Sequence, residues 1–226
     1  MKLTNQQIAQ IEETLALNNL KYDDIKLEVI DHIASEIEVL MDENDSSFEE
    51  NLKLVFGKWA ALLKPTTYGL WLGYAYSGPK IAMDKMANFA KSEIKWGIIL
   101  GFLSALIITL IYKLNNNINF LLMLGIILKA VLFTSALLTI YYRAILFKSK
   151  GRTTYSVMFK RRIYLFLLYA ISIALDFYPI VPLNKTLEVK ILSLIFPLML
   201  ILYSINSLRF LYKHFQFEKK LSISNS

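Results

Sequence analysis

The chain has 226 residues, of which 55% are hydrophobic, and a formal net charge of +7. It contains no cysteine and two histidines, which excludes disulfides, thiolate chemistry and the multi-histidine iron centres of membrane oxygenases and desaturases. Residues 1–90 carry 14 acids and 8 bases, a balance of −6, whereas residues 91–226 carry 4 acids and 17 bases, a balance of +13. Because these bases flank apolar runs, they indicate membrane orientation, and we do not expect nucleic-acid binding.

The distribution of apolar residues predicts an all-α membrane protein. Mean hydropathy is +0.44, and most of the apolar surplus follows residue 95. We expect a three-helix cytosolic domain at residues 1–64, a membrane-surface connector at 65–95 and a four-helix transmembrane domain at 96–226. The first ten residues, MKLTNQQIAQ, are too polar for a cleavable signal peptide.

Three amphipathic helices are predicted within residues 1–64. Thr4 and Gln7 form a capping box before the first, and the Ser46–Ser47 doublet, with a glutamate three residues beyond each serine, marks the start of the third. Apolar residues recur at spacings of three and four, which predicts one buried face per helix. These faces comprise Ile8, Ile11 and Leu15; Val29, Ile30, Ile33, Ala34, Ile37, Leu40 and Met41; and Phe48, Leu52, Val55, Trp59 and Leu62. Pro65 is expected to end the third helix.

The string DHIASEIE, residues 31–38, lies on the second of these helices. Glu28, His32 and Glu36 recur every fourth residue, on the face away from Ile33. His and Glu one turn apart can hold a metal ion, but the chain lacks the nearby imidazoles or thiolates that would complete such a site. We therefore favour a solvated acidic face on which His32 hydrogen-bonds to a carboxylate. Glu28, Asp31, His32 and Glu36 are the candidate partner-binding residues, and no metal or cofactor is expected.

The order of these features is similar to a known bacterial arrangement. The acidic helix with DHIASEIE, a short polar turn, and a helix that begins SSFEE and ends near a Trp and a Pro resemble the helical cytosolic domain of HAAS-type and permease-prefix-like membrane proteins. The resemblance covers about residues 1–90, and DENDSS stands here in place of the usual glycine-rich turn. It implies a cytosolic protein partner, such as a PadR-like transcriptional regulator.

The connector is rich in aromatic residues around glycines. It contains Tyr68, Trp71, Tyr74 and Tyr76. Such rings settle at the level of lipid headgroups, which predicts a segment lying on the membrane surface. The alternative is that the rings complete the core of the helical domain. Residues 81–89 suit a short interfacial helix, with the lysines at 80, 85, 91 and 95 facing anionic lipid.

Four membrane spans are predicted, at about residues 96–112, 118–142, 163–181 and 189–212. The loop at 143–162 holds seven bases, whereas the loops after the first and third spans hold one and two. Lysine and arginine mark the cytosolic side, so both termini are expected in the cytosol and the chain in the bacterial inner (cytoplasmic) membrane. The opposite charges of the helical domain and the basic loop suggest a contact between them.

Lys129 and Asp176 are the ionisable residues well inside the predicted spans, where an unpaired charge costs several kcal/mol. They are candidates for an ion pair that either serves packing or forms part of a proton or ion path; independent snorkelling is the alternative. Gly97, Gly101 and Ala105 recur every fourth residue. This stripe predicts close helix contact, with a neighbouring span or in a homodimer.

The sequence lacks a phosphate-binding glycine loop, a Gly-x-Ser-x-Gly elbow and a His-Glu-x-x-His string, and we assign no catalytic residue. We expect a non-enzymatic integral membrane protein whose helical domain docks a cytosolic protein in a regulatory role. A small transporter or channel subunit that uses Lys129 and Asp176 is the alternative. A membrane enzyme would depend on His32 and its carboxylates.

Overall fold

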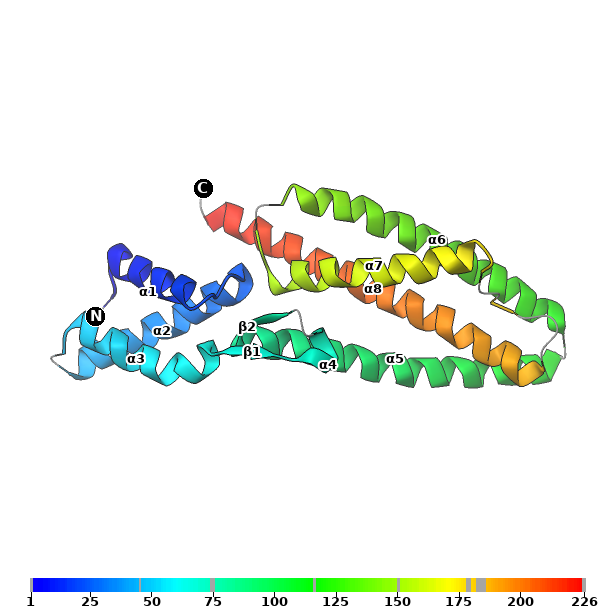
Figure 1. Ribbon diagram of the computed structural model, residues 1–226, viewed down its shortest axis with the longest axis horizontal. Coiled ribbons are helices and arrows are strands. Elements are labelled where there is room, and N and C mark those ends of the chain that lie inside the picture. The colour runs from blue at the N-terminus through cyan, green and yellow to red at the C-terminus, as the bar shows by residue number, and fades with distance from the viewer. Residues whose placement is uncertain are drawn as a thin grey trace. The chain divides into compact units, whose positions relative to one another are not determined.

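The computed structural model describes residues 2–44, 46–73, 76–115, 117–149, 151–177, 180–181 and 186–224. Its described residues are mostly helical, which confirms the predicted all-α class (Figure 1). The chain divides into two compact units. The first comprises Met1–Lys91 with Gly151–Thr154, and the second comprises Ser92–Lys150 with Tyr155–Ser226.

Among its described residues, the first unit contains four helices, two short strands and the start of a fifth helix. Its elements are α1 (Asn5–Leu17), α2 (Asp23–Glu43), α3 (Phe48–Leu63), β1 (Pro65–Thr67), α4 (Gly69–Leu72), β2 (Ser77–Pro79) and the first turns of α5 (Lys80–Asn115). The two strands pair antiparallel, with Thr66 opposite Gly78. The fully buried apolar side chains Ile11, Leu15, Val29, Ile33, Ile37 and Val55 form the core beneath α1, α2 and α3.

Two of the helices begin at the predicted capping boxes. The Thr4 hydroxyl accepts a hydrogen bond from the Gln7 backbone N–H, and the Gln7 side chain accepts one from the Thr4 backbone N–H at 2.8 Å. Ser47 and Glu50 make the same reciprocal pair at the start of α3. Each box satisfies two backbone donors that a helix N-terminus leaves open, which explains why these helices start where they do.

The core predicted for these helices is correct in its main positions, but two of its residues are exposed. Ile8 and Leu62 are 36% and 37% exposed, whereas Leu63 is 3% exposed. A helix advances 100° per residue, so Leu62 and Leu63 lie on different faces, and at the end of α3 the face toward the core is that of Leu63.

The boundary predicted after residue 64 lies inside the first unit, which extends to Lys91. Ala82, Met83, Met86 and Ala87 of α5 are almost completely buried. Met83, Met86 and Ala87 belong to the apolar residues of the helix predicted at 81–89, and they pack within the unit instead of lying on lipid. The segment is also not a separate helix, because α5 continues without interruption to Asn115.

The second unit consists of long apolar helices. It contains the rest of α5 together with α6 (Ile118–Phe147), α7 (Thr154–Ala174) and α8 (Leu187–Ser224). Among the described residues, three helices are long and apolar enough to cross a membrane, namely α5, α6 and α8. Their length and composition indicate a membrane protein. The buried core of the unit draws on all four helices, with Ile108, Leu132, Ala170 and Leu194 among its members.

The helix predicted as the third span differs from the prediction. α7 ends at Ala174, and Asp176 has a φ of 60°, in the left-handed region that does not continue a helix. The apolar part of α7 that follows its basic residues, 163–174, is about 18 Å long at 1.5 Å per residue, short of the roughly 30 Å of a hydrocarbon core. The loop predicted at 143–162 is also shorter than expected, because α6 runs to Phe147 and α7 begins at Thr154.

Candidate functional site

The acidic face predicted on α2 is present on the surface of the first unit. Glu28, Asp31 and His32 are exposed and Glu36 is half-buried, while Ile33 and Ile37 are fully buried on the opposite side. The four predicted residues therefore share one accessible face. Among the described residues, no group of three His, Asp or Glu side chains lies close enough together to hold a metal ion.

His32 contacts an aromatic ring on the neighbouring helix. The imidazole stacks on the Trp59 indole of α3, with ring centroids 6.4 Å apart and an interplanar angle of 28°. The Trp59 Nε1–H donates a hydrogen bond to Glu36 Oε1 at 3.1 Å. Trp59 was predicted as a core residue; it instead lies half-buried at the edge, where its ring supports His32 and its N–H orients Glu36.

Beside these side chains lies an open depression of about 460 Å³ between α2 and α3. Its lining residues are His32, Ser35, Glu36, Val39, Leu40, Glu43 and Lys58. Val39 is 54% exposed, so the depression offers an apolar surface next to carboxylates. Such a mixed surface suits an amphipathic protein segment better than a small polar substrate. A small substrate is usually held by several polar side chains that point to one place, whereas here the polar side chains are spread along an open surface.

The other end of α2 holds a junction that the sequence analysis did not identify. Asp24 is 8% exposed. Its carboxylate accepts hydrogen bonds from the Thr154 backbone N–H at 2.8 Å and from the Thr154 hydroxyl, and it lies 3.3 Å from Lys85 Nζ. Thr154 is the first residue of α7. Asp24 thus caps the N-terminus of a helix that begins 130 residues later in the chain.

Arg152 also contacts Asp23 and Tyr22, the two residues before Asp24. The Asp23 backbone N–H donates to the Arg152 carbonyl at 2.8 Å, and the Arg152 backbone N–H donates to Asp23 Oδ2 at 2.7 Å. The Arg152 guanidinium lies 5.5 Å from the centre of the Tyr22 ring, and burial raises the pKa of the Tyr22 phenol. Two helix N-termini therefore satisfy each other's backbone donors.

This arrangement corresponds to the predicted contact between the acidic helices and the basic loop, with a different chemistry. The loop contributes backbone N–H groups and a threonine hydroxyl to the carboxylates of Asp23 and Asp24. Lys85 of α5 supplies the cation, and it also lies 4.0 Å from Glu28 on the acidic face. The sequence analysis did not predict the contact of Asp24 with Thr154, because the two residues are 130 positions apart. An aspartate at the start of a helix is normally interpreted as a cap for that same helix.

In the second unit, Lys129 of α6 forms an ion pair with Asp176, two residues beyond the end of α7. The pairing that the sequence suggested is therefore present. Gly125, one turn before Lys129, lies against Ile180 and Val181. The Ser193 hydroxyl of α8 donates to the Ile180 carbonyl, so this non-helical backbone has a polar partner inside the bundle.

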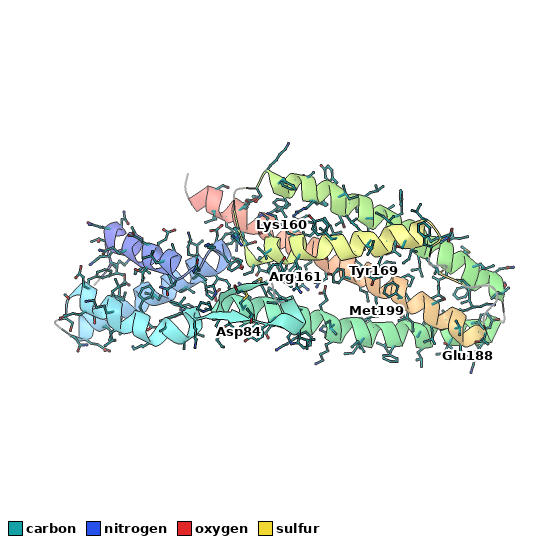
Figure 2. All side chains as sticks on the ribbon, in the orientation of Figure 1. Asp84, Lys160, Arg161, Tyr169, Glu188 and Met199 are labelled. Atoms are coloured by element: carbon teal, nitrogen blue, oxygen red, sulfur yellow. The ribbon has the colours of Figure 1, made fainter. Side chains whose placement is uncertain are left out.

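The small-residue stripe of α5 faces α8 of the same chain. A Cβ atom at Gly101 would lie 3.3 Å from Ile195 Cγ2, and one at Gly97 would lie 3.7 Å from Met199 Cε. Figure 2 shows Met199 on α8. Ala105 packs against the same apolar core. α8 thus occupies the stripe, which was predicted to hold either a neighbouring span or a second copy.

Three polar side chains around the buried His214 join the residues after α6 to α8. His214 is fully buried, its Nε2 lies 2.8 Å from Ser149 Oγ, and the Ser149 hydroxyl donates to Glu218 Oε1 at 2.6 Å. Glu218 Oε2 is 3.7 Å from the same ring nitrogen. A catalytic triad places the serine and the carboxylate on opposite ring nitrogens, so this geometry is that of a packing network.

These features define the class of the protein. It is a membrane protein with long apolar helices and a separate unit of amphipathic helices whose acidic face is accessible. Comparison with protein-family models, with curated proteins and with solved structures finds no match to this chain.

Proposed function

We propose that the protein is a non-enzymatic integral protein of the bacterial inner (cytoplasmic) membrane whose helical unit docks a cytosolic protein. The docking surface consists of Glu28, Asp31, His32 and Glu36 with the adjoining depression. The junction of Asp24 with Thr154 carries the proposal. It supports a regulatory role because α2 presents the docking face and, at its other end, caps the first residue of α7.

One continuous helix, α2, connects the docking face to the junction with Thr154. α2 is 21 residues long, about 32 Å at 1.5 Å per residue, and its inward face is buried from Ile25 to Ile37. A partner that shifts or clamps the acidic face therefore changes the geometry at Asp24 as well. The cap on Thr154 then strengthens or weakens. Because Thr154 is the first residue of α7, this change is transmitted directly to a helix of the second unit.

The chemistry of the docking face defines the kind of partner. Three carboxylates and an exposed valine favour an amphipathic segment that carries lysine or arginine beside apolar residues. A PadR-like transcriptional regulator is the partner implied by the resemblance of residues 1–90 to HAAS-type domains.

Capture experiments with the full-length protein in detergent test the docking face. The variant combines Glu28→Gln, Asp31→Asn and Glu36→Gln, and the control combines Glu13→Gln and Glu49→Gln on other exposed helix surfaces. We expect a cytosolic protein to be captured by the wild type and the control but not by the face variant. Equal capture by all three proteins, or by none, would contradict the proposal.

We also propose four crossings, with α7 and the residues after it forming the third. Lys129 lies about 16 Å and Gly125 about 10 Å from the start of α6 at 1.5 Å per residue. Asp176 pairs with Lys129, and Ile180 lies against Gly125. Beyond the end of α7, Ile180 is therefore nearer than Asp176 to the start of α6. Non-helical backbone is tolerated at membrane depth where it is packed within protein, and Ile180 is 2% exposed.

The orientation follows from the bases that run from the end of α6 into the first turns of α7, which include Lys160 and Arg161 (Figure 2). Because the chain has no cysteine, single-cysteine variants can report it directly. An impermeant maleimide added to intact cells should label Asn119→Cys but neither Leu17→Cys nor Ser222→Cys. If Asn119→Cys and Ser222→Cys are labelled and Leu17→Cys is not, the protein has three crossings. If Leu17→Cys is labelled, the orientation is the inverse of the one proposed.

A small transporter or channel subunit is the second candidate, and the ion pair of Lys129 with Asp176 is the observation that favours it. Charged side chains within the membrane are energetically costly, and those that occur there often serve a function. If the pair conducts, Lys129→Met with Asp176→Asn abolishes ion flux in proteoliposomes while the protein stays folded. If the wild type carries no flux, the pair serves packing.

A further inference from the structure

The hairpin between α3 and α5 exposes an apolar tip. Leu70, on α4 between the two strands, is 85% exposed, although Leu72 two residues later is 1% exposed. α4 ends at Leu72, and the next residue, Gly73, has a φ of 83°, which suits glycine and does not continue the helix. The fold therefore buries one leucine of the tip and leaves the other on the surface.

The hairpin follows α5 in the direction of the membrane span. Near the start of α5, a Cβ at Gly78 would lie 3.1 Å from Met83 Cε. Further along, the Tyr68 hydroxyl donates to Asp84, which is labelled in Figure 2. Furthest along, Lys91 Nζ lies 5.7 Å from the centre of the Trp71 ring and 6.0 Å from that of Tyr68. The tip thus reaches the level of Lys91.

The apolar part of α5 begins shortly after this level. Trp96 lies five residues beyond Lys91 on the same unbroken helix, about 7.5 Å along its axis at 1.5 Å per residue. From Trp96 onward, α5 exposes large apolar side chains, with Trp96 57% and Phe102 73% exposed. Lys91 and Lys95 are exposed immediately before this stretch. Lysines and aromatic rings next to a span mark the headgroup layer of a bilayer.

We propose that the hairpin tip inserts into the membrane surface, with Leu70 below the headgroups, Trp71 among them and Lys91 facing the lipid phosphates. The contact would hold the first turns of α5, and with them the helical unit, at a set distance from the bilayer. A lipid surface is the occupant we favour because the tip lies beside the helix that continues into the span of α5, and because the Lys91 ammonium beside the Trp71 ring offers a cation to anionic headgroups. This property is independent of the proposed partner docking.

Spin labels on single cysteines measure the depth of the tip. The full-length protein is reconstituted in vesicles of phosphatidylcholine with phosphatidylglycerol, and each label is compared for its accessibility to oxygen, which enters lipid, and to a water-soluble nickel complex. Leu70→Cys is the test. Leu17→Cys, at a leucine that is 78% exposed at the end of α1, is the water control, and Phe102→Cys is the lipid control.

We expect the ratio of oxygen to nickel accessibility at residue 70 to exceed that at residue 17 several-fold and to approach that at residue 102. A ratio at residue 70 equal to that at residue 17 would overturn the proposal. Spin–spin broadening at residue 70 that disappears on dilution with unlabelled protein would also overturn it, because the tip would then contact a second copy.

The lysine is tested separately in the same vesicles. With Lys91→Gln, the oxygen-to-nickel ratio at residue 70 should fall in vesicles that contain phosphatidylglycerol and stay unchanged in pure phosphatidylcholine. A fall in both lipids would show that Lys91 acts by supporting the Tyr68 and Trp71 rings, and the role assigned to the lipid phosphates would be wrong.

Discussion

Replacement of Asp24 with alanine is the most direct test of the junction that links α2 to the start of α7. The wild-type carboxylate accepts two hydrogen bonds from Thr154 and is paired with Lys85. Alanine removes both acceptors and fills none of the space. Since Thr154 is fully buried, water cannot replace the lost partner of its backbone N–H without opening the structure.

The magnitude follows from the same contacts. A hydrogen bond to a charged group contributes about 1.5 to 3 kcal/mol, and Asp24 accepts two from Thr154. Lys85 is partly exposed, with 28% of its side chain accessible, so its ion pair adds little to this sum. We expect Asp24→Ala to lower the free energy of opening at the junction by about 3 to 5 kcal/mol, and Asp24→Asn by less because one acceptor oxygen remains.

Hydrogen–deuterium exchange of the full-length protein in detergent gives the free energy of opening for each segment. With Asp24→Ala, exchange should accelerate both in the first turns of α2 and in residues 151–156, because each end caps the other. Asp31→Ala, on the exposed face of the same helix, is the control and should change the opening free energy by less than about 0.5 kcal/mol. If the two variants exchange alike, the junction does not hold these segments together.

Three further changes test the helix start, the ion pair and the helix contact. The N-terminus of α3 lowers the pKa of Glu50 through hydrogen bonds with Ser47, so its stabilisation is present above the unfolded pKa of about 4.3 and is lost as pH falls through the lower folded pKa. The melting temperature of Glu50→Gln should therefore differ from that of the wild type at neutral pH and converge with it in acid. Lys129→Met should lower the melting temperature in detergent more than Lys129→Met with Asp176→Asn, because the single change leaves a carboxylate without its cation; the reverse order would exclude a stabilising pair. Gly101→Leu should destabilise the second unit by about 1 to 3 kcal/mol through overpacking against α8, whereas Gly57→Leu, where a Cβ meets no atom within 4 Å, should not, and equal melting of the two variants would argue against the contact.

Local signals in the sequence predicted the parts of the fold that depend on neighbouring residues. The capping boxes located the starts of α1 and α3, and the three-and-four spacing located Ile33 and Ile37 on the buried face of α2. The same spacing placed Glu28 and His32 on one exposed face. These inferences succeed because a helix fixes the direction of each side chain relative to residues one turn away.

Two features that depend on distant residues were not predicted, although the Lys129 pair with Asp176 was. The pattern of residues 81–89 was identified as amphipathic, but amphipathicity cannot distinguish lipid from protein as the apolar partner, and Met83 and Met86 pack within the first unit. In the same way, the Asp24 side chain offers an acceptor to any nearby donor, and only the fold brings Thr154 to it. The sequence offered one signal for this contact. Two adjacent aspartates, Asp23 and Asp24, stand at the start of α2, although one is enough to cap a helix, so the other was available to a different donor.

The early end of α7 bears on the regulation that we propose. A helix of 20 apolar residues is held in a bilayer by its own length, because every backbone group is paired within it. The apolar part of α7 is shorter than that, so its position depends on contacts with the rest of the protein. Phe166 and Ala170 pack into the core along its length, and its ends are held by the cap that Asp24 gives to Thr154 and by the Lys129 pair with Asp176. A change at either end therefore removes part of what holds this helix in place. A partner bound to α2 therefore needs to alter only the cap at Thr154 to change how this helix is held, which makes α7 the element through which docking would act on the membrane unit.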